Sequence, residues 1–123
     1  MKITAVKGFP VKVGHRNQWL VKVETDAGIS GVGEGGISGR ELAMQGMLEH
    51  YARFLVGEDP FRIEHLWQTM YRSAYFEGGK IAGAVISAVD ITLWDILGNA
   101  LGVPVYQLLG GACREQIRCF VTP

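Results

Sequence analysis

The segment from Ile81 to Ala100 constrains the fold most, because it predicts a helix that is apolar on nearly every side. An ordinary surface helix keeps one polar face toward water, whereas a helix of this kind has to be enclosed by other parts of the protein. The remainder of a 123-residue chain offers little that could enclose it. We therefore expect a further domain or a partner to cover part of this helix.

Alternating side chains predict strands in the first 34 residues. Residues 2–13 place apolar side chains at odd positions, with a break around residues 8–10, which is the period of a strand with one wet face. These odd positions are Ile3, Ala5, Val11 and Val13. A second strand is predicted over residues 19–24 and a third over residues 29–34, joined by the turn-forming sequence Asp26-Ala27-Gly28. The opening is predicted to be a three-stranded antiparallel meander.

Helical spacing follows the meander. Ser38 and Glu41 have the spacing of a capping box, which predicts a helix beginning at Ser38 and ending before Gly57. Asp59 followed by Pro60 predicts the start of the next helix, since proline loses nothing at the first helical position. Together with residues 81–100, these helices predict the fold class α+β, a three-stranded antiparallel meander followed by a helical bundle.

The last 20 residues predict a short helix from Pro104 to Leu109, bounded by glycines. Strand character returns from Ile117 to Val121, with no later strand to pair with it. An unpaired strand at this point suggests continuation into a second domain.

Charge and cysteine content exclude several classes of function. Lysine plus arginine and aspartate plus glutamate balance at 12 each, so there is no basic surface that favours nucleic acid or an anionic membrane. The first residues alternate polar and apolar side chains and do not form a signal peptide. Cys113 and Cys119 have neither CxxC spacing nor further partners for zinc. A reducing, cytoplasmic setting and a small-molecule or protein partner are predicted.

A GxGxxG pattern at residues 31–36 raises dinucleotide binding as an alternative function. Such a site needs a parallel strand after the following helix, to complete a right-handed strand-helix-strand unit. Here the chain passes through Gly57 and Asp59-Pro60 directly into another helix. Turn geometry and close packing are the favoured explanation of these glycines.

Three segments resemble one known family. They are ETDAGISGVGE at the end of the meander, AVISAVDITLWDILGNALGVPVYQLLGG in the apolar helix and beyond, and IRCFVTP near the end of the chain. Together they resemble the N-terminal capping domain of the enolase superfamily, of the mandelate racemase and muconate lactonizing enzyme type. The segment MYRSAYFEGG is most similar to the galactonate and mannonate dehydratase branches.

The resemblance implies residues 1–113 as a capping domain and residues 114–123 as the start of a TIM-type barrel, the rest of which lies outside this chain. It implies an acid-sugar dehydratase in which three barrel carboxylates hold Mg²⁺. A lysine or histidine would remove the proton next to the substrate carboxylate, and the metal would stabilise the enediolate before water leaves. Racemase, epimerase or cycloisomerase chemistry on the same scaffold is the alternative. The catalytic and metal-binding residues would lie in the barrel, so the 123-residue chain alone is expected to be inactive, and the whole enzyme to be a homo-oligomer.

Two loops would then lie over the substrate, at residues 14–19 and 34–39. His15, Arg16, Asn17 and Trp19 are the predicted substrate contacts in the first loop, because a polyhydroxy acid needs hydrogen-bonding groups and an apolar surface. Asn17 leads this set, since GHRNQWLVKV resembles a mannonate dehydratase segment in which an asparagine faces the substrate. A solvated turn is the alternative.

Tyr75 is a further predicted substrate contact, because Tyr75, Phe76 and Glu77 precede a double glycine where related dehydratases carry aromatic and charged residues. Glu77 replaces an arginine of those relatives, which changes the expected preference among anionic substrates. Packing at a helix end is the alternative for the two aromatic residues. Asp90 and Asp95 point about 140° apart around their helix and so cannot hold one ion together. They are predicted to bond backbone groups or a barrel arginine.

Overall fold

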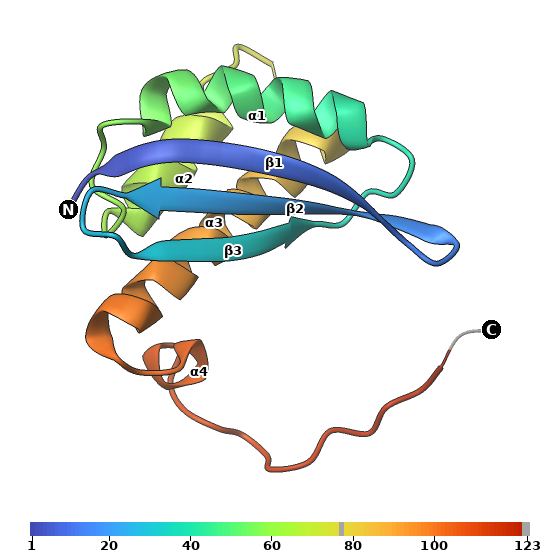
Figure 1. Ribbon diagram of the computed structural model, residues 1–123, viewed down its shortest axis with the longest axis vertical. Helices are drawn as coiled ribbons and strands as arrows, with labels where there is room; N and C mark the ends of the chain where they lie inside the picture. The colour runs from blue at the N-terminus through green and yellow to red at the C-terminus, as the bar shows by residue number, and fades with distance from the viewer. Residues whose placement is uncertain (77, 122–123) are drawn as a thin grey trace.

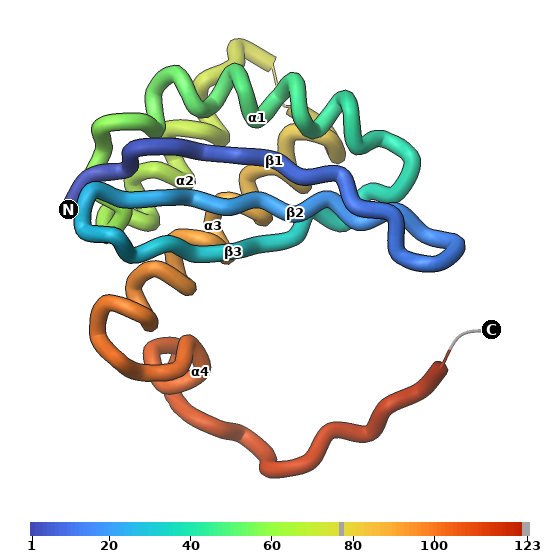
Figure 2. Tube along the Cα trace, in the orientation of Figure 1, coloured from blue at the N-terminus to red at the C-terminus, as the bar shows by residue number. Residues whose placement is uncertain are grey.

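The structure, a computed structural model, describes residues 1–76 and 78–121. One antiparallel sheet has the strand order β1-β2-β3, and helices cover one of its faces (Figures 1 and 2). The elements are β1 (Ile3–Val13), β2 (Arg16–Thr25), β3 (Ser30–Gly35), α1 (Glu41–Leu55), α2 (Ile63–Arg72), α3 (Gly79–Leu101) and α4 (Val105–Leu108). The predicted α+β class, with a meander followed by helices, is confirmed.

The core lies between the sheet and the helices. Strand β2 supplies Trp19, Val21 and Val23, which alternate along the strand and are completely buried. They share one apolar cluster with Met44 and Leu48 of α1 and with further residues of the helices. The residues of α3 in this cluster are Val85, Ile86, Ala88, Val89, Leu93 and Ile96. Each large apolar side chain buried in this way contributes roughly 1.5–3 kcal/mol relative to exposure.

Strand β1 departs from the predicted alternation. Its register shifts between Ile3 and Ala5, which is a bulge, and the strand runs without interruption through residues 8–10. Because side chains alternate with a period of two, an extra residue moves all later side chains to the opposite face. Ile3 is therefore buried, whereas Val11 and Val13 are exposed on the outer face of the sheet. The prediction that these odd positions share one buried face is wrong.

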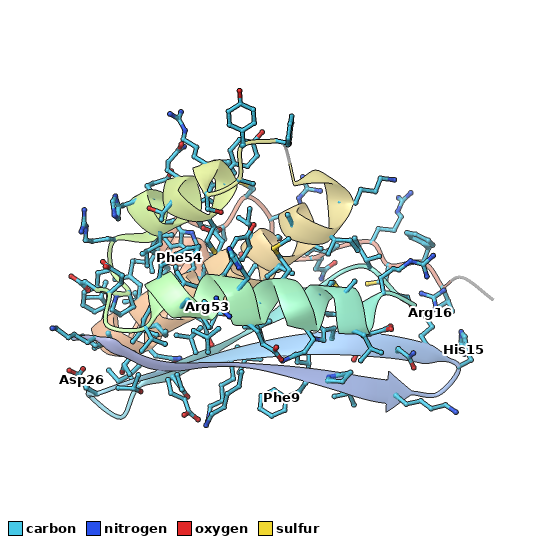
Figure 3. The ribbon with its side chains drawn as sticks, turned by 90° about the horizontal axis from the view of Figure 1, so that it is seen from above. Phe9, His15, Arg16, Asp26, Arg53 and Phe54 are labelled. Carbon is cyan, nitrogen blue, oxygen red and sulfur yellow. The ribbon has the colours of Figure 1, made fainter. Side chains whose placement is uncertain are left out.

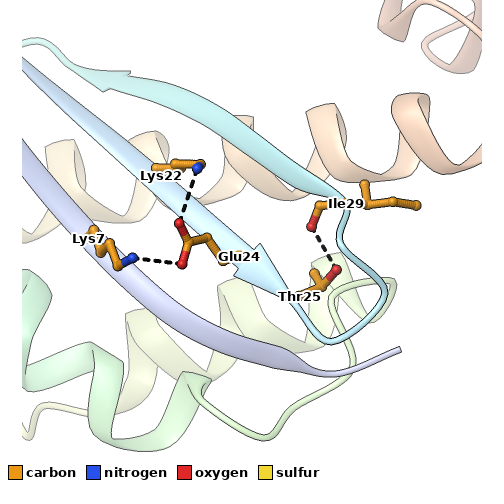
Figure 4. Close-up of polar contacts among 5 residues, drawn as sticks. All are labelled: Lys7, Lys22, Glu24, Thr25 and Ile29. Carbon is orange, nitrogen blue, oxygen red and sulfur yellow. Dashed lines mark hydrogen bonds and ion pairs between the residues drawn. The ribbon is translucent and has the colours of Figure 1, made fainter.

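The uncovered face of the sheet carries charge as well as apolar side chains. Glu24 accepts hydrogen bonds from Lys7 Nζ at 2.7 Å and Lys22 Nζ at 3.1 Å (Figure 4). These bonds lower the pKa of the Glu24 carboxyl. At the adjacent turn, Thr25 Oγ1 donates to the Ile29 carbonyl at 2.7 Å and closes the connection between β2 and β3.

Strand β3 lies directly against α3 because its inward positions are glycine. A Cβ atom on Gly31 would stand 2.3 Å from the Thr92 carbonyl oxygen, and one on Gly33 would stand 2.1 Å from the Ala88 carbonyl oxygen. Both distances are far below van der Waals contact, and both neighbours are helix backbone. The first two glycines of the GxGxxG pattern thus serve close strand–helix packing, whereas a Cβ on Gly36, the third, would meet nothing within 4 Å.

The outward edge of β3 is covered by polar side chains of α3. Asp95 Oδ2 accepts a hydrogen bond from the Val32 backbone N–H at 2.9 Å, and Asn99 Nδ2 donates to the Ser30 carbonyl at 3.2 Å. Asn99 also donates to Asp95 Oδ1 at 3.4 Å, which joins the two side chains. The predicted structural role of Asp95, bonding to backbone, is confirmed.

Helix α3 is longer than predicted and is better enclosed by its own chain. The sheet, α1 and α2 cover most of its length, and Ile91 and Leu101 remain exposed. By length and composition this helix could cross a membrane, but half of its most apolar window is buried inside the fold. The chain itself therefore encloses about half of this helix, and the expectation that a further domain covers part of it stays a prediction.

Both predicted helix starts are too early. α1 begins at Glu41, whose carboxylate accepts a hydrogen bond from the Gly39 backbone N–H at 2.7 Å, and Ser38 lies outside the helix. α2 begins at Ile63, because Asp59 Oδ1 accepts from the Phe61 N–H at 3.0 Å and closes a separate turn before the helix. Capping side chains are present at both places, but they stabilise turns that precede the helices.

Residues 112–121 follow α4 as an extended segment that forms no strand (Figure 1). Ile117, Phe120 and Val121 are 77%, 85% and 92% exposed. A strand needs a hydrogen-bonding neighbour, and none of the described residues supplies one here. The predicted strand over residues 117–121 is thus not formed in this structure, and the domain boundary at residue 113 stays a prediction.

Candidate functional site

One end of the sheet holds a cavity of about 290 Å³. Its walls are the β1–β2 hairpin and the segment after β3, the two loops predicted to lie over a substrate. The lining residues are Val13, His15, Arg16, Asn17, Gln18, Glu34, Gly35, Gly36 and Ser38. Three of the five predicted contact residues, His15, Arg16 and Asn17, therefore meet in one place.

Strand register explains why the two loops meet. Val13 pairs with Arg16, so Gly14 and His15 form a tight two-residue turn, and Gly14 has a φ of 59° that suits glycine. β3 ends beside β2 where Trp19 pairs with Gly35. Figure 3 shows His15 and Arg16 at this end of the sheet, opposite the turn that contains Asp26.

A hydrogen bond joins the two walls of the cavity. Ser38 Oγ donates to the Asn17 carbonyl at 3.5 Å. Next to it, the Glu41 carboxylate accepts from the Gly39 backbone N–H at 2.7 Å. Backbone hydrogen bonds from Glu41 and Gly39 lower the pKa of the Glu41 carboxyl. The bond from Ser38 thus joins the segment after β3 to the hairpin, just before the N-terminus of α1.

The cavity combines charges of both signs. Arg16 and His15 offer hydrogen-bond donors, Glu34 offers a carboxylate acceptor, and Asn17, Gln18 and Ser38 offer both. Within the described chain, neither Arg16 nor Glu34 forms an ion pair with another side chain. Such a lining suits a ligand that carries several hydroxyl groups.

The structure places Trp19 away from this cavity. Its side chain is 0% exposed, packs into the core, and donates from Nε1 to Gln45 Oε1 at 3.3 Å. The prediction of Trp19 as a substrate contact is not supported, because the inward alternation of β2 turns its indole toward the helices. The hydrophobic pattern of residues 19, 21 and 23 already carried this signal.

Tyr75 also lies outside the cavity. It is 96% exposed on the connection between α2 and α3, where its ring meets Phe76 edge-on at 5.0 Å. This connection lies on the helical side of the molecule (Figure 1). Glu77, which was singled out for its charge, lies outside the described residues.

A second and larger cavity was not predicted from the sequence. It measures about 630 Å³ and lies between α1 and the start of α3. Glycine and alanine make up much of its wall, and its polar groups come from His50, Tyr51, Tyr71 and Ser73. Burial raises the pKa of Tyr51, and Ser73 Oγ already donates to the Met70 carbonyl at 2.8 Å. Most of the residues around the larger cavity are small or apolar, whereas polar side chains make up most of the lining of the smaller cavity.

The described residues do not fit a metal site. No group of three or more His, Cys, Asp or Glu side chains comes close enough together to hold an ion within residues 1–76 and 78–121. Asp90 has a raised pKa because it is partly buried and faces the like charge of Glu64. Asp95 is bonded to β3. Any magnesium ligands must therefore come from outside the described residues.

Dinucleotide binding is not supported by the topology. All strand pairs are antiparallel, so the described chain has no parallel strand-helix-strand unit. Gly31 and Gly33 face the backbone of α3, leaving no room for a pyrophosphate group there.

Comparison with known proteins identifies the family. The family described as "Mandelate racemase / muconate lactonizing enzyme, N-terminal domain" matches residues 9–110. The chain belongs to this family. The resemblance to capping domains of the enolase superfamily is thereby confirmed.

Individual members of the family are similar along almost the whole chain. A D-galactonate dehydratase family member from Pseudarthrobacter chlorophenolicus is 47% identical over 98% of this chain, which covers 29% of that protein. A D-galactonate dehydratase from Variovorax paradoxus is 46% identical over 98% of this chain and 31% of its own length. The chain thus spans about a third of the length of these curated relatives.

A solved structure shows the same fold. The crystal structure of an enolase from Pantoea ananatis, with D-gluconate and Mg bound, matches with a TM-score of 0.86 and 40% identity. The match covers 91% of this chain and 28% of that one. The meander and helices described above therefore correspond to a minor part of a larger enolase structure.

Proposed function

We propose that this chain is the capping domain of a longer sugar-acid dehydratase, and that it recognises the end of the substrate away from the reacting carbon. The observation that carries the proposal is the meeting of His15, Arg16 and Asn17 with Glu34 and Ser38 around one cavity. Relatives that share almost all of this chain are named D-galactonate dehydratases, which supports the reaction class.

The chain's own residues would bind, orient and shield the substrate. Asn17, Ser38 and Gln18 would bond hydroxyl groups, while the hairpin excludes water from the reacting centre. Magnesium, bound by residues outside this chain, would stabilise negative charge at the substrate carboxylate when the proton next to it is removed. Proton transfer itself is assigned to none of the residues described here.

The lining favours a substrate whose far end is uncharged. Arg16 and Glu34 together bring no net charge to the cavity, so a second carboxylate would gain attraction from one and repulsion from the other. A terminal hydroxyl group avoids the repulsion and can bond either side chain. We therefore propose an aldonic acid, with one carboxylate, in preference to an aldaric acid with two.

The test is a screen of the protein expressed from its complete gene. Dehydration is measured as keto-acid formation over a panel of aldonic and aldaric acids, with Mg²⁺ and again after its removal by a chelator. Turnover of an aldonic acid that disappears with the metal supports the proposal. Absence of keto acid from every member of the panel would overturn it.

Racemase or cycloisomerase chemistry is the second candidate, because the family description itself names mandelate racemase and muconate lactonizing enzyme. These reactions also begin by removing a proton next to a carboxylate, but they lose no water. Incubation in D₂O separates the candidates. A racemase returns deuterated substrate of both configurations without keto acid, whereas a dehydratase accumulates keto acid.

A further inference from the structure

Trp19 connects the two walls of the smaller cavity. Along β2 it follows Asn17 and Gln18, which line the hairpin wall, and in the sheet it pairs with Gly35, which lines the other wall. Trp19 is itself completely buried and does not line the cavity. It can therefore act on a ligand only through the residues that pack on it.

Gly35 packs against the six-membered ring of this indole. A Cβ atom on Gly35 would stand 2.6 Å from Trp19 Cε3, 3.0 Å from Cζ3 and 3.3 Å from Met44 Sδ. The backbone of β3 thus contacts the ring with no side chain between them. The chain leaves the sheet at Gly35 and continues along the cavity through Gly36 and Ser38. The position of the ring therefore sets the position of this wall.

A hydrogen bond from α1 holds the indole. Trp19 Nε1 donates to Gln45 Oε1 at 3.3 Å. Gln45 Nε2 in turn donates to Glu49 Oε1 at 3.2 Å, one turn further along the helix. The second bond orients the Gln45 amide, because the Glu49 carboxylate accepts from its nitrogen and leaves its oxygen to the indole.

Gly8 makes room for this contact. A Cβ atom on Gly8 would overlap Gln45 Oε1 and would stand 3.1 Å from Trp19 Cζ2. Gly8 lies within β1 and is not among the glycines with a positive φ, so space rather than backbone strain requires glycine here. Gly8 and Gly35 therefore place no side chain against the ring. The Nε1 hydrogen bond is the directional contact that holds it.

We propose that Gln45 is a positioning residue for the cavity, which holds the Trp19 indole where Gly35 packs on it and so fixes the wall that continues after β3. The inference rests on the proposed function, because it assigns a part in ligand binding to the same cavity. A wall held in the binding position loses less conformational freedom when a ligand binds, and this strengthens binding.

The test is the KM of the complete enzyme for an aldonic acid after Gln45→Met. This substitution removes the acceptor for Trp19 Nε1 while keeping a side chain of similar size. It is expected to raise KM about fivefold, the change for one hydrogen bond, with kcat altered less than twofold. Gly8→Ala, which displaces the Gln45 amide without removing it, should raise KM in the same way. An unchanged KM in either variant would overturn the proposal.

An exchange of two side chains on α1 provides a rescue. Gln45→Glu combined with Glu49→Gln keeps an acceptor beside Trp19 and a donor one turn away, and it leaves the net charge of the helix unchanged. KM should return to within about twofold of its original value, because the indole hydrogen bond is restored. A KM as high as that of Gln45→Met would contradict the positioning role.

Gln68→Met is the matched control. It makes the same chemical change at an exposed position of α2, and it should leave KM unchanged. A rise equal to that of Gln45→Met would show that the effect does not depend on Trp19, and the inference would fail.

A readout that needs no activity separates failure of this inference from failure of the proposed function. In protein with isotopically labelled tryptophan and glycine nitrogens, Gln45→Met should shift the NMR signal of the Trp19 indole N–H, which Trp19→Phe identifies by its loss. The backbone amide signals of Gly35 and Gly36 should shift with it. If these glycine signals stay in place, the indole does not support the wall and the inference fails. If they shift in a protein that turns over no sugar acid, the positioning contact stands and the proposed function fails.

Discussion

At the residue scale, glycine decides how closely the sheet and α3 approach. Gly31 and Gly33 allow the backbone of β3 to contact helix backbone, which cannot move aside without shifting the whole helix. Gly31 and Gly33 therefore serve packing, although their sequence pattern is also typical of phosphate-binding loops.

Gly33→Ala is expected to destabilise the chain strongly. Its Cβ would stand 2.1 Å from the Ala88 carbonyl oxygen and 2.8 Å from Thr92 Oγ1, and overpacking of this kind costs about 1–3 kcal/mol or more. Urea denaturation followed by circular dichroism measures the change. Gly46→Ala is the control, because its Cβ meets nothing within 4 Å on α1 and should stabilise the helix by about 0.5–1 kcal/mol. Equal effects of the two substitutions would refute the packing argument.

Single residues were the hardest feature to predict from the sequence. Asn17 could be placed near the cavity because the hairpin is local and its turn is encoded by Gly14. Trp19 could have been excluded by alternation, since it shares the inward face with Val21 and Val23. The hydrogen bond from Ser38 Oγ to the Asn17 carbonyl joins residues 21 positions apart, and no local pattern encodes such a pair.

At the element scale, α3 organises the molecule. It packs against the sheet, α1 and α2, and its Asp95 and Asn99 side chains bond the free edge of β3. A strand edge without such cover presents free backbone groups to other chains. Two polar residues one turn apart therefore protect the sheet as well as stabilise it.

Asp95→Ala is expected to lower stability by about 1–2 kcal/mol, because a hydrogen bond to a charged group contributes about 1.5–3 kcal/mol and Asp95 is partly exposed. It should also promote concentration-dependent association through β3. Asn99→Ala removes only neutral bonds and should have a smaller effect. Denaturant titration and light scattering measure both changes. If Asn99→Ala proved more harmful than Asp95→Ala, the assigned edge protection would be incorrect.

The order and type of the elements could be predicted, whereas their ends could not. Hydrophobic periodicity alone predicted the meander and the main helices, because the buried side of each element repeats at a fixed spacing in the sequence. The predicted starts of α1 and α2 are too early, because Asp59 accepts from the Phe61 N–H before α2 and Ser38 bonds the hairpin instead of capping α1. The bulge near Ile3 was invisible in the sequence, and it reversed the face on which Val11 lies.

At the scale of the whole molecule, the ionisation of Asp90 depends on what covers α3. Burial and the nearby charge of Glu64 raise its pKa above the ordinary value of 3.8. Because the pKa is raised on folding, ionisation of Asp90 lowers the free energy of unfolding. This loss is absent at pH values below the ordinary pKa and complete at pH values above the raised pKa. In the described chain this charge has no partner within hydrogen-bond distance.

Asp90→Asn is therefore expected to stabilise the 123-residue polypeptide at pH 7 and to have no effect below about pH 3.8. In the complete protein the sign should reverse, because a cation from the remaining domain would pair with Asp90 and be left unpaired by the substitution. Urea titrations of both proteins at the two pH values measure the difference. Stabilisation of both proteins at pH 7 would argue that no such cation exists.

We propose above all that the cavity between the β1–β2 hairpin and the segment after β3 binds the distal end of a sugar acid. The most direct measurement is the distance from the Asn17 side-chain amide to the nearest ligand hydroxyl oxygen, in a crystal of the complete protein with an aldonic acid and Mg²⁺. We predict a hydrogen bond of about 2.7–3.0 Å. A bound acid whose hydroxyl groups contact only residues outside this chain, with the cavity facing bulk water, would contradict the account.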